Sequence, residues 1–317
     1  MTDSRGMASD ILAGSPRALA RLMRELEDET PQARAMLASL ASHGGHAFVV
    51  GLTGAPGAGK STLVDALVTA YRHRGQKVGV VAVDPSSPLS GGALLGDRVR
   101  MQQHATDPGV FIRSLAARGN LGGLARSAQD VVDVLDVAGF DVVFVETVGV
   151  GQGEMDVKQL ADLTVVVTVP GLGDGVQALK SGLLEVADAL VVNKADRQGA
   201  DATERDLRAM LALRAVGCKD VPILRTQALN GSGIAELVGC LDSAATALNP
   251  ATRVVRRQRR ARRRLQDSVV AAARLRIDSR LGEAGWDKWA QEIAAGHRSV
   301  EDLLTYVFEP EPGGTIT

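Results

Sequence analysis

The sequence predicts an α/β fold in which helices cover both faces of a mostly parallel β-sheet. From residue 46 to about residue 248, short runs rich in valine alternate with longer segments of helical periodicity, such as 123–137 and 202–216. Several of the valine-rich runs show no apolar–polar alternation, as is typical of strands buried on both faces. Because this order gives parallel sheets, ligand-binding loops are expected at the carboxyl ends of the strands. The predicted strands cover residues 47–52, 78–83, 110–112, 141–145, 163–169, 189–192 and 221–224.

A helical extension is predicted ahead of the sheet, over residues 1–45. Within it, Ser15-Pro16 and Thr30-Pro31 each place a capping hydroxyl before a proline at the first helical position. We therefore expect two short helices between residues 15 and 42, packed on the domain that follows at 46–248. Their apolar stripes are Leu19, Leu22, Met23 and Leu26 for the first helix, and Met36, Leu37 and Leu40 for the second.

A helical arm is predicted after the sheet, over residues 249–317. Residues 253–264 contain eight arginines. This run could contact RNA or phospholipid, or it could be the solvated face of a helix. No aromatic residues interleave with the arginines as base-stacking platforms would, which favours the helix. Apolar residues on that helix suggest a subunit contact, and these are Leu265, Val269, Ala272 and Leu275. A last short helix is expected over 298–308.

Composition excludes several classes of protein. The net charge of −1 argues against wholesale nucleic-acid binding. Cys218 and Cys240 form no disulfide or zinc pattern, and His43 and His46 lack further metal ligands nearby, so we expect exposed loop histidines. The polar N-terminus lacks the apolar stretch of a signal peptide, and no apolar run approaches the ~18 residues of a membrane span. We expect a cytoplasmic protein with no membrane contact.

A phosphate-binding loop is predicted between the first strand and the helix that follows it. Residues 54–62 fit G-x-x-x-x-G-K-[ST], a pattern whose backbone N–H groups cradle phosphates. Lys60 is expected to reach the β- and γ-phosphates and Ser61 to bind Mg²⁺, while Gly57 and Gly59 allow close backbone approach. The predicted nucleotide-binding residues here are Gly54, Ala55, Pro56, Gly57, Ala58, Gly59, Lys60, Ser61 and Thr62.

A guanine-binding element is predicted at the end of the sixth strand. Asn193-Lys194-Ala195-Asp196 directly follows the apolar run 189–192. The carboxylate of Asp196 can accept hydrogen bonds from guanine N1–H and the 2-amino group. Adenine offers neither donor, so a site built on Asp196 penalises ATP. Gln227, Ala228 and Leu229 follow the seventh strand and either complete the base pocket through backbone N–H groups or form a plain loop.

Metal-binding and γ-phosphate-sensing residues are predicted at the ends of two further strands. Glu146 ends the run 141–145, where it could hold Mg²⁺ through water, and the Gly149 N–H could sense the γ-phosphate. Asp84 and Asp97 are each either a Mg²⁺ ligand or a solvated acidic residue.

The hydrolytic step is expected to depend on groups supplied from elsewhere. Val150 occupies the place where Ras-like switches carry a glutamine that positions the attacking water, so intrinsic hydrolysis should be slow. Asp174 and Lys180 lie in a Gly-rich loop that runs into a helix at the same sheet edge. They either supply such groups or are surface residues.

Taken together, these motifs resemble those of the MeaB/ArgK family of P-loop GTPases, which includes the human methylmalonic aciduria type A protein. The resemblance covers roughly residues 10–300. It rests on G-A-P-G-A-G-K-S-T at 54–62, V-D-P-S-S at 83–87, G-x-x-L-G-D-R at 92–98, F-D-V-V-F-V-E-T-V-G-V-G-Q at 140–152, P-G-x-G-D at 170–174 and N-K-A-D at 193–196. Two departures are Gly153, where many relatives have serine, and the arginine density at 253–264.

The resemblance implies a P-loop GTPase that binds GTP and GDP with Mg²⁺. Ser61 and Asp97 would ligate the metal, with Asp84 and Glu146 close by. Residues 84–98, 146–156 and 170–181 would be three switch loops, the last of which carries Asp174 and Lys180. With Lys60, Asp97 and Glu146, these two would form the catalytic set, and residues 249–317 would be a dimerisation arm.

The resemblance also implies a role as a chaperone. Family members gate adenosylcobalamin delivery from a cobalamin adenosyltransferase and protect or reactivate an acyl-CoA mutase. Cobalamin would sit only on the partner, since this chain has no D-x-H-x-x-G element. The alternatives are a P-loop kinase, a nickel-insertion-type GTPase and a GTPase that binds nucleic acid through its arginine run.

Overall fold

The computed structural model describes residues 2–85, 102–104, 106–117, 123–147, 153–171, 184–213 and 220–308. The chain divides into two compact units, residues 1–260 and residues 261–317. The first unit contains the sheet, and the described part of the second is mainly helical. No helix in these described ranges is long and apolar enough to cross a membrane.

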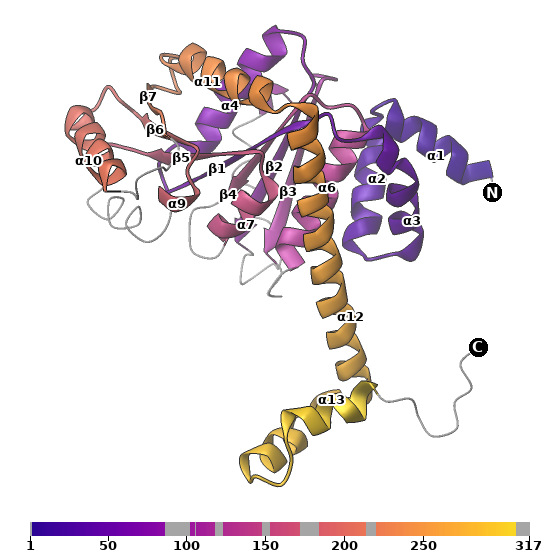
Figure 1. Cartoon of the computed structure of the whole chain (residues 1–317). Coiled ribbons are helices and arrows are strands. Elements are labelled where there is room, and N and C mark those ends of the chain that lie inside the picture. The colour runs from indigo at the N-terminus through magenta and orange to yellow at the C-terminus, as the bar shows by residue number, and fades with distance from the viewer. Residues whose placement is uncertain are drawn as a thin grey trace. The chain divides into compact units, whose positions relative to one another are not determined.

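The first unit is built on a seven-stranded sheet in which every described strand pair is parallel (Figure 1). The strand order is β3-β2-β4-β1-β5-β6-β7. This confirms the predicted α/β fold, and each predicted run becomes a strand. The strands are β1 (Phe48–Gly54), β2 (Val78–Pro85), β3 (Val110–Ala117), β4 (Val142–Thr147), β5 (Leu163–Thr168), β6 (Ala189–Asn193) and β7 (Ile223–Thr226).

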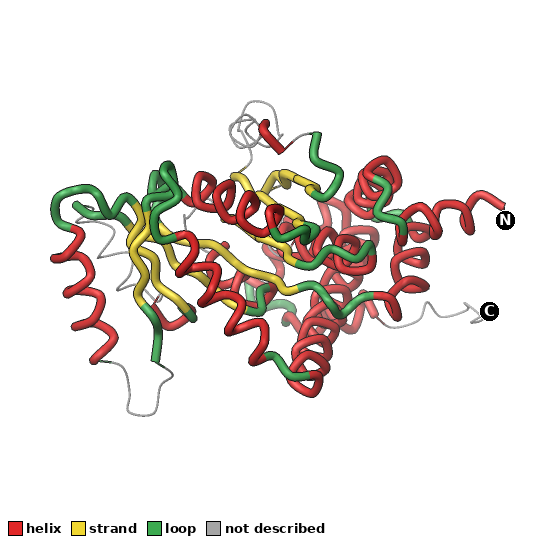
Figure 2. Tube along the Cα trace, turned by 90° about the horizontal axis from the view of Figure 1, so that it is seen from above, coloured by secondary structure: helices red, strands yellow, loops and turns green. Residues whose placement is uncertain are grey.

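Helices bury both faces of the sheet, which explains the absence of alternation in the strand sequences. Every residue of β1, β4, β5 and β6 is buried. One face packs on α4 (Lys60–His73) and α11 (Ile234–Ala247). The other packs on α6 (Gly123–Val137) and α7 (Gly153–Leu160), while α10 (Ala200–Ala212) covers the β6–β7 end. Figure 2 shows the strands running between helices.

The N-terminal extension packs on α6 and consists of α1 (Thr2–Leu12), α2 (Pro16–Glu27) and α3 (Pro31–Leu40), followed by a short turn η1 (Ala41–His43). The two predicted helices are present with their apolar stripes turned inward, but the sequence did not predict α1. Thr30 caps α3 by accepting from the Ala33 N–H, whereas Ser15 makes no side-chain cap. The histidines His43 and His46 are exposed, as expected.

The connection from this extension into β1 is held by one carboxylate. Asp136 on α6 accepts backbone N–H groups from Gly45, His46 and Ala47, at 2.5, 2.9 and 2.9 Å. A second link is the ion pair between Arg113 on β3 and Glu27 on α2. The extension is therefore tied to the sheet by polar contacts as well as by its apolar core.

The remaining helices are η2 (Gln102–His104), α9 (Leu184–Val186), α12 (Pro250–Ala294) and α13 (Val300–Phe308). The helix α12 lies in the helical arm predicted over 249–317, and α13 corresponds to the last short helix expected over 298–308. Gly282 interrupts α12 with φ 61° and ψ 177°, which breaks it into two helical segments. The second unit has a small core of its own around Trp289, Leu303 and Val307.

Candidate functional site

The predicted phosphate-binding loop lies between β1 and α4, at the carboxyl edge of the sheet. Residues 54–62 comprise the last residue of β1, a tight turn and the first three residues of α4. The N-terminus of α4 therefore faces the loop, where its backbone N–H groups and dipole favour an anion. This is the strand–loop–helix arrangement that the sequence predicted.

Two glycines in the loop are required by close contacts. A Cβ on Gly54 would lie 2.0 Å from the Val167 carbonyl oxygen of β5. A Cβ on Gly59, whose φ is +84°, would lie 2.6 Å from the Asn193 amide nitrogen. The sequence explained these glycines by the close approach of the backbone to phosphates. The structure adds a second reason for Gly59, which is that the end of β6 lies against the loop.

Lys60 is buried, with 6% of its surface exposed, and its ammonium is held within the loop. Its Nζ donates to the carbonyl oxygens of Gly54 at 2.8 Å and Ala55 at 3.1 Å. These bonds keep the positive charge at the mouth of the loop.

Ser61 and Glu146 come together although 85 residues separate them in the chain. The Ser61 hydroxyl donates to Glu146 Oε1 at 2.7 Å, and both side chains are buried. A hydroxyl and a carboxylate are the hard oxygen donors that Mg²⁺ prefers, so this pair fits the predicted metal. Within the described part of the chain, no three His, Cys, Asp or Glu side chains gather into a metal site. Mg²⁺ commonly uses few protein ligands and completes its shell with water and phosphate.

Asn193 connects the predicted base-binding element to the phosphate-binding loop. Its side chain is 2% exposed and its Nδ2 donates to the Ala58 carbonyl oxygen at 2.9 Å. Its Oδ1 accepts from Thr226 Oγ1 at 3.1 Å and from the Ala228 N–H at 3.2 Å. Asn193 thus holds three segments of the chain in one arrangement.

The neighbours of Asn193 stand at the open side of the site. Lys194 has a positive φ of 54°, and its Nζ donates to the Gly57 carbonyl oxygen at 2.8 Å. Asp196 is exposed to solvent. The short segment from 194 to 196 therefore lies beside the phosphate-binding loop with its carboxylate accessible to a ligand.

The segment after β7 supports Asn193. The sequence left open whether the Ala228 N–H faces the base or belongs to a plain loop. It donates to Asn193, and the Gln227 N–H donates to the Ser232 carbonyl oxygen. Leu229 is 92% exposed. Sequence reasoning missed Thr226, whose hydroxyl also orients Asn193. The sequence did offer a signal for this role, since Thr226 is a hydroxyl residue just after the last predicted strand, which pairs with the strand that carries Asn193.

Several predicted site residues cannot be placed. Gly149, Asp97, Asp174 and Lys180 lie outside the described residues, as does the side chain of Asp84. Their assigned roles remain predictions. The described geometry brings together the loop 54–62, Glu146, Asn193–Asp196 and Gln227–Leu229.

Comparison with known proteins identifies the family. The sequence model of the MeaB family, described as the methylmalonyl-CoA mutase-associated GTPase MeaB, matches residues 19–281. The chain belongs to the MeaB family. This confirms the resemblance that the motifs indicated.

Named relatives of this MeaB-family chain agree with the assignment. A Pyrococcus abyssi protein provisionally named as a GTPase is 53% identical over 228 residues, which are 71% of this chain and 70% of the relative. The Escherichia coli GTPase ArgK is 42% identical over 187 residues, 58% of this chain and 56% of ArgK. The mitochondrial methylmalonic aciduria type A homolog of Caenorhabditis elegans is 42% identical over 150 residues, 47% of this chain and 38% of the homolog. These names support guanine-nucleotide binding and GTPase activity.

A solved structure shares the fold. The crystal structure of an LAO/AO transport system kinase superposes with a TM-score of 0.71 and covers 97% of each chain at 24% sequence identity. At this identity the likeness supports the α/β architecture alone.

Proposed function

We propose that this MeaB-family chain binds Mg·GTP between the loop 54–62 and the segment 193–196 and hydrolyses it to GDP and phosphate. The observation that carries the proposal is the hydrogen bond from Asn193 Nδ2 to the Ala58 carbonyl oxygen. It fixes the base-binding strand end directly against the phosphate-binding loop. A nucleotide that bridges the two would find both halves of its site already in register.

Each described residue has a defined task in this proposal. Lys60 would exchange its contacts with loop carbonyls for the β- and γ-phosphates, where its charge offsets the charge that develops in phosphoryl transfer. Ser61 and Glu146 would hold Mg²⁺, whose charge further stabilises the phosphates. Asp196 would accept the two N–H donors of guanine, which adenine lacks.

The residues outside the described ranges complete the proposal. Asp97 and Asp84 would join Ser61 and Glu146 around Mg²⁺, and the Gly149 N–H would sense the γ-phosphate. Asp174 and Lys180 would belong to a loop that completes the hydrolytic site when a partner docks. Since Val150 stands where Ras-like switches carry glutamine, hydrolysis by the chain alone would be slow.

We propose an adenosylcobalamin-dependent acyl-CoA mutase as that partner. The support is the description of the MeaB family, which names association with methylmalonyl-CoA mutase. GTP hydrolysis would gate cofactor delivery from a cobalamin adenosyltransferase and protect or reactivate the mutase, with cobalamin bound only by the partner.

We further propose a cytoplasmic homodimer joined through the arm 249–317, with the nucleotide site in the domain 46–248 and the helical extension in 1–45. Apolar side chains stand exposed along α12, including Leu265 at 68%, Val269 at 66% and Leu275 at 63%. A second copy of the chain would remove them from water.

The test of the chaperone role is the GTP hydrolysis rate of the purified chain with and without purified methylmalonyl-CoA mutase. We expect the mutase to bind and to raise the rate. A chain that neither binds a mutase nor changes its hydrolysis rate would contradict the role. ATP preference in a direct titration would favour a P-loop kinase, and tight nickel binding would favour a nickel-insertion-type GTPase.

A further inference from the structure

We infer that Arg225 is a positioning residue for the guanine site, because its guanidinium fastens the start of α10 to the end of β7. Arg225 lies on β7, one residue before Thr226, and α10 begins four residues after Asp196. This inference rests on the proposed guanine-nucleotide binding and assigns part of its affinity to an ionic network that flanks the base loops.

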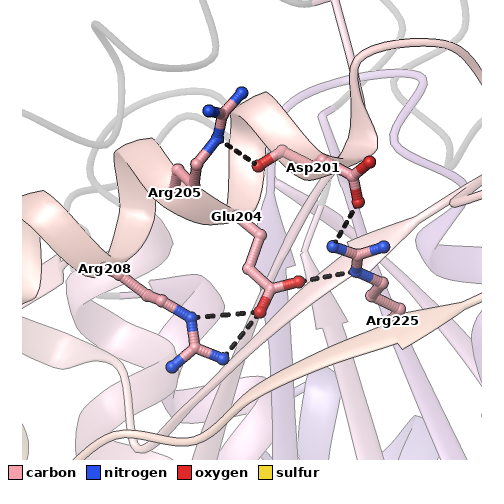
Figure 3. A network of polar contacts seen from close by, with 5 residues as sticks. All are labelled: Asp201, Glu204, Arg205, Arg208 and Arg225. Carbon is pink, nitrogen blue, oxygen red and sulfur yellow. Dashed lines mark hydrogen bonds and ion pairs between the residues drawn. The ribbon is translucent and has the colours of Figure 1, made fainter.

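The network joins one strand to one helix through two carboxylates (Figure 3). Arg225 Nε donates to Glu204 Oε2 at 2.5 Å, and Arg225 Nη2 lies 2.7 Å from Asp201 Oδ1. Arg208 approaches Glu204 Oε1 from the other side at 2.6 Å. Hydrogen bonds from Arg208 and then Arg225 lower the pKa of Glu204, so its carboxylate is charged at neutral pH. The Glu204 side chain is 16% exposed, which makes it the sheltered centre of the network.

The network lies at the end of the α10–β7 contact that is nearest the proposed base site. Further from that edge the contact is apolar, with Ile223 of β7 packed in a cluster that includes the fully buried Leu207 of α10. Arg225 follows Ile223 on the same face of the strand, since side chains alternate along a strand. Apolar packing therefore holds the body of α10, and ionic contacts hold its first turns.

Both ends of the segment that carries Asp196 are fixed to β7. At the first end, Asn193 accepts from Thr226 Oγ1, and the Ala195 N–H donates to the Thr226 carbonyl oxygen at 3.1 Å. At the second end, Asp201 in the first turn of α10 contacts Arg225. Loss of Arg225 would remove the ionic contacts at the second end and loosen the first turn of α10, while the apolar packing of Leu207 would still hold the body of the helix.

The turn that carries Ala228 also packs on Arg225. A Cβ on Gly233 would lie 1.9 Å from the Arg225 carbonyl oxygen, so the chain passes directly over the Arg225 backbone. The Gln227 N–H closes this turn on Ser232. The start of α10 therefore contacts the Arg225 side chain, whereas the turn contacts its backbone, a contact that Arg225→Ala would keep.

A base site held in place before the nucleotide arrives loses less conformational freedom on binding, which slows nucleotide release. We expect the Arg225→Ala variant to release a fluorescent GDP analogue about threefold to tenfold faster at low salt. The KM for GTP should rise while kcat stays unchanged. Arg225→Lys should give an intermediate rate, because an ammonium keeps the charge but cannot bridge two carboxylates as a planar fork does.

Two further variants separate positioning from general stability. Glu204→Gln removes the negative charge between Arg208 and Arg225 with little change in side-chain size, and it should also speed GDP release. Arg205→Ala removes an arginine from the same helix that donates, among the described residues, to the Asp201 carbonyl oxygen and to no side chain of the network, and it should match the unmodified chain. High salt should bring release from the unmodified chain toward the Arg225→Ala rate, because the network is partly exposed.

The outcomes are distinct. If Arg225→Ala and Glu204→Gln both release GDP within twofold of the unmodified chain, the inference is wrong. It is equally wrong if Arg205→Ala speeds release as much as Arg225→Ala, or if Arg225→Ala lowers kcat alone. Failure of the unmodified chain to bind the GDP analogue at all would instead overturn the proposed function.

Discussion

Asn193→Ala tests the connection between the two halves of the proposed site. The substitution removes three hydrogen bonds of a side chain that is 2% exposed, to Ala58, Thr226 and Ala228. At about 1 kcal/mol for each bond, the free energy of unfolding should fall by about 3 kcal/mol. The bond to Ala58 is the one that aligns the loop 54–62 with the end of β6, where we propose that the base binds. Its loss alone should weaken GDP binding about tenfold, which corresponds to about 1.4 kcal/mol.

Thr226→Val is the matched variant, because it removes one donor to Asn193 and leaves the bond to Ala58 in place. It should lower the free energy of unfolding by about 1 kcal/mol and change GDP affinity by less than about threefold. Urea denaturation measures the first quantity for each variant, and calorimetric titration with GDP measures the second. If folded Asn193→Ala binds GDP as tightly as the unmodified chain, or if Thr226→Val weakens GDP equally, the proposed alignment is refuted.

Two further predictions concern stability at the opposite edge of the sheet. Asp136→Asn replaces one of the two oxygens that accept the N–H groups of Gly45, His46 and Ala47, and it should lower the free energy of unfolding by about 1–3 kcal/mol. Asp206→Asn is the control, because Asp206 is exposed on α10, and it should leave the free energy of unfolding unchanged. Equal urea midpoints for the two variants would contradict this prediction. Burial, followed by the charge and hydrogen bond of Asp242, raises the pKa of Tyr71 above its ordinary value of 10.0. The folded chain then keeps this proton where the unfolded chain loses it, so stability present below about pH 10 falls as the pH rises further. Tyr71→Phe should flatten that alkaline loss in denaturation series at rising pH, whereas Tyr306→Phe, at an exposed tyrosine, should leave it unchanged; equal slopes in the two variants would count against the reasoning.

The sheet could be predicted from the sequence because its strands carry their own signal. Val142, Val143 and Val145 are buried in β4, and no register or partner was needed to recognise such a run as a strand. The phosphate-binding loop was equally accessible, since its function requires fixed residue types at fixed spacing. The helix α1 could not be predicted in this way, because its apolar residues are few and Ile11 is buried only through contact with other helices.

Contacts between residues far apart in the chain could not be predicted from the sequence. Nothing local indicates that Ser61 meets Glu146, or that the Ala228 N–H faces Asn193. The first contact follows from the strand order, which places β4 beside β1, and the second follows from the pairing of β7 with β6. The same holds for Arg225, which reads as an ordinary surface arginine until β7 is placed beside α10.

The central claim is that the site binds guanine nucleotides, and titration of the unmodified chain with Mg·GTP and Mg·ATP tests it most directly. Because guanine offers the adjacent N1–H and 2-amino donors to Asp196 and adenine lacks both, the account predicts GTP binding at least about a hundredfold tighter than ATP binding. Equal affinity for the two nucleotides, or tighter binding of ATP, would contradict it.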